Sequence, residues 1–127
     1  MSIRIAPDKN QPSATIEIPL ERALPDYDLH QLEHPTPRDV DGVLVSQGFR
    51  DLVDDARGIL TELLSGTGLE LAQFTGAICP GDDETYRPGL WIVLRDKNSL
   101  QGRELSSDSR TRISAVAEEL VKRLQLA

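Results

Sequence analysis

An apolar repeat at three- and four-residue steps between residues 49 and 64 constrains the fold of this 127-residue chain more than any other feature. On a helix, this spacing gathers the apolar side chains on one face. Ser46 precedes the repeat as a predicted N-cap, and Gly66 and Gly68 follow it as residues that accept the left-handed conformation at a helix end. We therefore predict a long amphipathic helix over residues 46–65. Its apolar face comprises Phe49, Leu52, Val53, Ala56, Ile59, Leu60, Leu63 and Leu64.

Other segments have the patterns of β-strands. Residues 15–20 alternate between apolar and polar side chains, and Pro19 lacks the N–H that an interior strand donates, so we expect an edge strand there. Residues 90–94 are apolar on both faces, which is typical of a central strand. The alternation of residues 69–79 slips near Gln73 and Phe74, which predicts a β-bulge. Shorter strands are expected around Ile3 and Ile5 and at residues 43–45.

The order of these segments predicts the fold class. About ten residues join the strands at 69–79 and 90–95, which is too few for a helical crossover, so these strands should pair antiparallel. A final amphipathic helix is expected over residues 107–125, with a core face that includes Ile113, Val116 and Leu120. The prediction is one α+β domain spanning residues 1–127. It has an antiparallel sheet of four to five strands with two amphipathic helices packed on one face.

Composition limits the possible partners. The net charge is −7, and residues 21–62 alone hold ten acidic and four basic side chains. This balance argues against nucleic acid and anionic membrane as partners, because both require a basic surface. There is one cysteine, Cys79, which we interpret as a buried structural thiol. No apolar run reaches the length of a signal peptide or a membrane span, so we expect a cytoplasmic protein.

One short motif suggests catalysis. Residues His30, Glu33 and His34 form the pattern H-x-x-E-H, which resembles the core of the pitrilysin-type metallopeptidase motif. The resemblance implies a zinc ion held by the two histidines and a water polarised by Glu33. In that family the helix continues past the second histidine, whereas Pro35 stops it here, and no third ligand is evident. A metal-dependent hydrolase is therefore the alternative reading, and two surface histidines are the simpler one.

No motif brings titratable side chains together with the spacing that a reaction needs. We therefore expect a non-catalytic binding or accessory protein without a cofactor: an adaptor, an inhibitor or immunity-type partner, or a subunit of an assembly. We expect its partner to be a protein with a basic surface, and a homodimer is a second expectation. Two loops are the candidate contact regions, the proline-containing acidic excursion 21–41 and the hairpin tip 80–89. The predicted partner-binding residues are Asp26, Tyr27, Asp28, Asp82, Asp83, Glu84, Tyr86 and Arg87.

Overall fold

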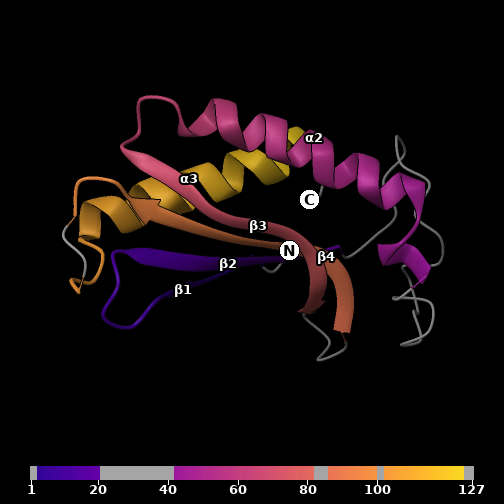
Figure 1. The fold of residues 1–127 in the computed structure, drawn as a ribbon, viewed down its shortest axis with the longest axis horizontal. Coiled ribbons are helices and arrows are strands. Elements are labelled where there is room, and N and C mark those ends of the chain that lie inside the picture. The colour runs from indigo at the N-terminus through magenta and orange to yellow at the C-terminus, as the bar shows by residue number, and fades with distance from the viewer. Residues whose placement is uncertain (1–2, 21–41, 82–85, 100–101, 125–127) are drawn as a thin grey trace.

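The computed structural model describes residues 3–20, 42–81, 86–99 and 102–124, in which two strands precede each of two long helices (Figure 1). The strands form one antiparallel sheet in the order β1-β2-β4-β3. This arrangement confirms the predicted α+β class. The elements are β1 (Arg4–Pro7), β2 (Ser13–Pro19), α2 (Gln47–Leu64), β3 (Leu69–Pro80), β4 (Tyr86–Asp96) and α3 (Ser107–Leu124).

The two helices begin and end as local chemistry dictates. The Ser46 hydroxyl accepts a hydrogen bond from the Phe49 N–H at 3.2 Å and caps α2. Gly66 and Gly68 follow α2 with φ of 75° and 74°, a conformation that costs glycine little. Ser106 caps α3 in the same manner as Ser46, by accepting from the Ser109 N–H at 3.2 Å. Neither helix is both long and apolar enough to cross a membrane, within the residues described.

The strand expected at residues 43–45 is wrong. Residues 42–44 are helical, and they form a short turn that leads into α2. The Ser46 N–H donates to the Val43 carbonyl at 3.0 Å, and the Ser46 hydroxyl donates to the same oxygen at 2.8 Å. These local hydrogen bonds outweigh the weak preference of valine for strands.

The edge position expected for residues 15–20 is also wrong, because β2 lies between β1 and β4. Pro19 is tolerated there because the described pairing of β1 with β2 stops at Glu17, whose partner is Arg4. The next N–H, that of Leu20, donates to Pro88 on the β4 side at 3.0 Å. Since successive amides of a strand point to opposite sides, the missing N–H of Pro19 falls on the β1 side, beyond those pairs.

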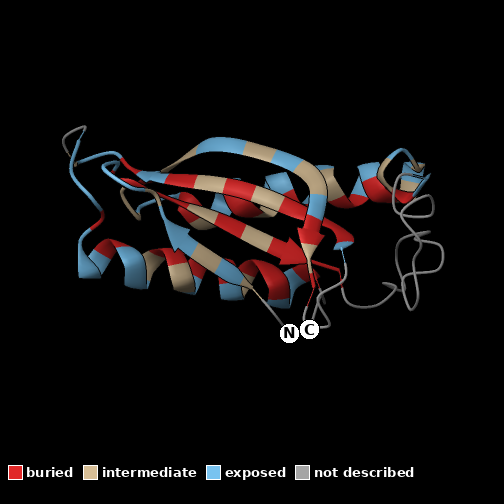
Figure 2. Ribbon diagram, turned by 90° about the horizontal axis from the view of Figure 1, so that it is seen from below, coloured by how far each residue is buried: buried red, intermediate tan, exposed pale blue. Residues whose placement is uncertain are grey.

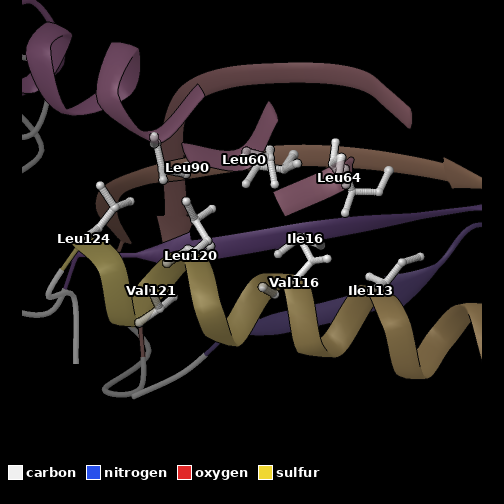
Figure 3. Packing of buried hydrophobic residues seen from close by; sticks show 14 of the residues in the cluster. Ile16, Leu60, Leu64, Leu90, Ile113, Val116, Leu120, Val121 and Leu124 are labelled. Carbon is white, nitrogen blue, oxygen red and sulfur yellow. The ribbon is translucent and has the colours of Figure 1, made fainter. Parts of the chain in front are cut away.

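The core lies between the two helices and one face of the sheet. Ile16 is opposite Ile92, and Ile18 is opposite Leu90, so these side chains point to the same face. Figure 3 shows α3 side chains directed at this face and toward α2, and Figure 2 shows the resulting alternation of buried and less buried strand residues. Each Leu or Ile buried here contributes about 1.5–3 kcal/mol. On the opposite face, Trp91 remains only half-buried.

Candidate partner-binding surface at the end of the β3–β4 hairpin

Two exposed apolar side chains lie on one face of the β3–β4 hairpin near its tip. Tyr86 is 68% exposed and Ile78 is 45% exposed. Tyr86 is opposite Pro80, and Ile78 is opposite Pro88. Because these positions alternate by two along each strand, all four point to the same side of the hairpin. We call these four residues the hairpin end; Pro88 is buried, so Tyr86, Ile78 and Pro80 are the members that face solvent.

Arg87 and Cys79 are opposite each other on the other face of the same hairpin, and both are buried. The two strands bend together at this end, as Figure 1 shows, and β4 pairs there with the end of β2, where Pro19 is opposite Gly89. At Gly89 the approach is so close that a Cβ would meet the backbone of Ile18 and Pro19. Sequence reasoning placed Tyr86 and Arg87 on one contact surface. The pleat separates them, because neighbouring residues of a strand face opposite ways.

Burial makes Cys79 an unreactive thiol. Loss of solvation raises its pKa to about 11, and the nearby negative charge of Glu17 adds to the effect. The sulfur lies 3.6 Å from the Leu90 carbonyl, to which the thiol can donate weakly. At neutral pH the thiol therefore keeps its proton, and the interpretation of Cys79 as a buried structural residue is confirmed.

Alkaline unfolding tests the state of this thiol. The pKa of about 11 in the folded chain exceeds the ordinary value of 9.0, so the folded state binds the proton more tightly between these limits. The stability that the protonated Cys79 thiol contributes is fully present below pH 9.0 and is lost as the pH rises toward about 11, at up to about 1.4 kcal/mol per pH unit. We expect urea unfolding to show this fall in wild type and a shallower one in Cys79→Ala. Equal slopes in the two proteins would contradict the assignment.

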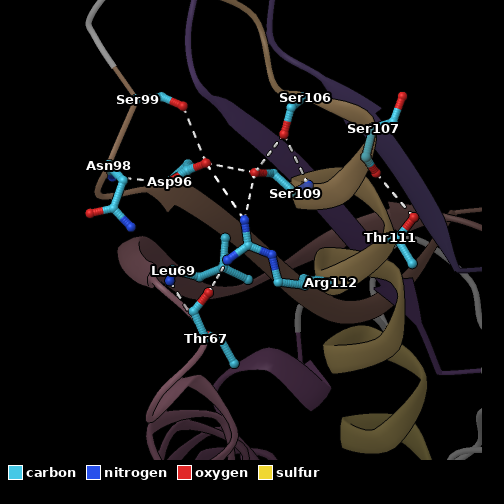
Figure 4. Close-up of polar contacts among 10 residues, drawn as sticks. All are labelled: Thr67, Leu69, Asp96, Asn98, Ser99, Ser106, Ser107, Ser109, Thr111 and Arg112. Atoms are coloured by element: carbon cyan, nitrogen blue, oxygen red, sulfur yellow. Dashed lines mark hydrogen bonds and ion pairs between the residues drawn. The ribbon is translucent and has the colours of Figure 1, made fainter.

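A cluster around Asp96 is the most extensive polar network among the described side chains (Figure 4). Asp96 is 5% exposed and ends β4. Its carboxylate accepts from the Ser109 hydroxyl at 2.5 Å, the Ser99 hydroxyl at 3.2 Å and the Asn98 N–H at 2.9 Å, and Arg112 lies 3.9 Å away. The Ser109 hydrogen bond, more than any other contact, lowers the pKa of Asp96.

The Asp96 cluster joins several connecting segments of the fold. Arg112 donates to the carbonyl of Thr67, in the turn between α2 and β3. The Asp96 N–H donates to Pro12, in the connection between β1 and β2, at 2.8 Å. Ser109 is fully buried, so a substrate does not reach its hydroxyl. Sequence reasoning treated residues 96–106 only as a loop, although a signal was present: an aspartate directly after an apolar strand and a serine pair before a helix.

Two shallow grooves lie between α2 and β3. The first, of about 250 Å³, is lined by Leu44, Phe49, Arg50, Val53, Asp54, Thr75 and Gly76. The second has a similar volume of about 250 Å³ and is lined by Thr61, Leu64, Ser65, Leu69, Glu70, Leu71 and Lys97. Both grooves are open and carry mixed charge, which is a poor match to the enclosed apolar pockets of small-molecule sites.

The remaining predicted site residues lie outside the described residues. They are Asp26, Tyr27, Asp28, His30, Glu33, His34, Asp82, Asp83 and Glu84. In the part of the chain that is described, no group of three His, Cys, Asp or Glu side chains is placed to hold a metal ion. Comparison of the chain with models of known protein families, with curated proteins and with solved structures gave no match.

Proposed function

We propose that this chain is a non-catalytic binding or accessory protein, such as an adaptor, an inhibitor or a subunit of an assembly, and that the hairpin end contacts its protein partner. The observation that carries the proposal is the exposure of Tyr86 and Ile78 on one side of one hairpin. Tyrosine presents a large rigid surface to a partner at low cost in conformational entropy, and such side chains are frequent anchors of interfaces.

Charge supports a basic partner. Asp82, Asp83 and Glu84 lie two to four residues before Tyr86 in the sequence, and the chain as a whole carries a net charge of −7. Acids beside an apolar contact attract a basic surface and speed the encounter, while the apolar side chains slow dissociation. Arg87, buried within the chain, has no part in this proposed contact.

Affinity purification from the source cells tests the proposal, with the full chain as bait. We expect wild type to retain a specific protein partner and the double variant Ile78→Ser, Tyr86→Ala to lose it. Once the partner is known, Tyr86→Ala alone should speed dissociation by about tenfold or more, the effect of removing a buried aromatic anchor.

A matched control separates a specific contact from general stickiness. Val45 is 67% exposed and lies before α2, outside the hairpin, so Val45→Ser removes a comparable apolar surface elsewhere. This variant should retain the partner. Retention by the hairpin variant, or equal loss with both variants, would contradict the hairpin end as the binding surface.

A further inference from the structure

The outer edge of β3 is the longest open strand edge in the described part of the molecule. β3 and β1 are the two edge strands of the sheet, and β3 has twelve residues where β1 has four. Figure 2 shows β3 along one side of the sheet, exposed or half-buried over most of its length. Such an edge presents a row of backbone donors and acceptors that another strand can pair with.

β3 has few of the features that protect strand edges. It contains no lysine or arginine, and its proline, Pro80, is its last residue. Its irregularity lies between Leu71 and Gln73, which leaves residues 73–79 regular. Those seven residues are uncharged, and the one acid of the strand, Glu70, already pairs with Arg95 at 3.1 Å. Natural edges usually carry charges, prolines or a bulge to prevent pairing, and within residues 71–79 only the bulge is present.

The side of α2 that borders this edge carries charges of both signs. Arg50 and Asp54 line the first groove with Thr75. Arg57 lies over the ring of Phe74 of β3, with its guanidinium carbon 5.2 Å from the ring centre. In chain order, a positive, a negative and a positive side chain follow one another on this side of the helix: Arg50, Asp54 and Arg57. The strip beside β3 is therefore close to neutral in a chain of net charge −7.

The other acids of α2 are turned away from this strip. Glu62 pairs with Arg123 of α3 at 3.6 Å, so its side of the helix faces α3. Asp51 and Asp55 share that side of α2, since they precede Glu62 by eleven and seven residues, close to whole helical turns. Acidic side chains that would repel a second acidic chain are thus kept away from the open edge.

We infer that the β3 edge pairs with β3 of a second copy of this chain, antiparallel and centred near Thr75, to form one continuous eight-stranded sheet. A two-fold axis there places Gln73 opposite Ala77 of the partner copy, and no charged residue faces another. The same axis runs the two α2 helices antiparallel. Because Thr75 shares its groove with both Arg50 and Asp54, the axis passes between these two positions, so that Asp54 of each copy approaches Arg50 of the other. An arginine and an aspartate on either side of a two-fold axis are complementary to their own symmetry copies, which favours a second copy over an unrelated peptide.

Sedimentation equilibrium of the full chain tests this inference, with loading concentrations from about 1 to about 200 micromolar. The mass should rise from 14.0 kDa toward twice that value. Thr75→Lys places like charges across the axis and should raise the dissociation constant about tenfold or more. Ala6→Lys is the matched control, because it makes the same change on the same sheet face of β1, the opposite edge strand. It should leave the dimer unchanged.

Hydrogen exchange of the wild-type chain gives a second measurement that needs no substitution. Amides of residues 73–79 should exchange more slowly at high than at low protein concentration, whereas those of β1 should not change. A monomer mass throughout the concentration range overturns the inference. So does a dimer that Ala6→Lys weakens as much as Thr75→Lys, or concentration-dependent protection that is absent from β3. None of these outcomes decides the hairpin-end proposal, which predicts binding to a different protein and shares only Ile78 with the segment 73–79.

Discussion

Replacing Asp96 by Asn should lower the free energy of unfolding by about 3 kcal/mol at pH 7. The carboxylate is 5% exposed, and it accepts from Ser109, Ser99 and the Asn98 N–H. An amide of the same shape keeps one acceptor oxygen but brings two N–H donors to partners that also donate. It also leaves the charge of Arg112 without its carboxylate. Urea unfolding measures the loss as a shift of the midpoint with an unchanged slope.

The control for this change is Asp108→Asn. Asp108 is an exposed carboxylate in the first turn of α3, where its charge interacts only with the helix dipole. We expect it to cost less than about 1 kcal/mol. If Asp96→Asn costs no more than Asp108→Asn, the network in Figure 4 contributes little to stability, and the connecting segments are held by the core alone.

The effect of Asp96 should also depend on pH. Its hydrogen bonds, that of Ser109 foremost, hold the pKa below the ordinary 3.8, so near that pH the unfolded chain binds the proton more readily than the folded one. The stability contributed by the carboxylate is therefore present above pH 3.8 and is lost as pH falls through the folded pKa. The difference between wild type and Asp96→Asn should narrow in acid. A difference that stays constant down to the acid transition would contradict this.

Replacing Gly76 by Ala should lower the free energy of unfolding by about 1–3 kcal/mol, although alanine is ordinarily the better strand residue. A Cβ at Gly76 would lie 2.5 Å from Cε1 and 2.9 Å from Cζ of Phe49. Phe49 is 2% exposed in the first turn of α2, so its ring cannot move out of the way into solvent. The glycine lets this end of α2 lie directly on β3.

A double-mutant cycle identifies the contact. Phe49→Leu alone should destabilise the chain, but in the Gly76→Ala background it should cost less or even restore stability, because the smaller side chain makes room for the methyl group. Gly58→Ala is the matched glycine control. A Cβ at Gly58 meets nothing within 4 Å, so this change inside α2 should stabilise by up to about 1 kcal/mol. Additive effects of the Phe49 and Gly76 substitutions would show that the steric account is wrong.

The sequence by itself determined the elements whose signals are local. The apolar spacing of residues 49–64 defines a helix because side chains three and four apart share a face. Ser46 caps it because a serine oxygen reaches the amide three residues on. Likewise, residues 90–94 are apolar on both faces and lie in the interior strand β4. The slip in alternation near Gln73 corresponds to a bulge in β3. Each of these features depends on side chains that are only a few residues apart in the sequence.

The tertiary structure alone decided what depends on distant residues. From the sequence, Pro19 indicated an edge strand. The described pairing of β1 with β2 stops at Glu17, so a proline two residues further on fits an interior strand. The tertiary structure also decided which face of the hairpin is covered, so that Arg87 is buried and its neighbour Tyr86 is exposed. Asp96 and Arg112 are sixteen residues apart in the sequence. Arg112 also donates to the carbonyl of Thr67, which precedes both β3 and β4 in the chain. Local propensity carries no information on such encounters, because strand order and loop packing are set by the burial of the whole core.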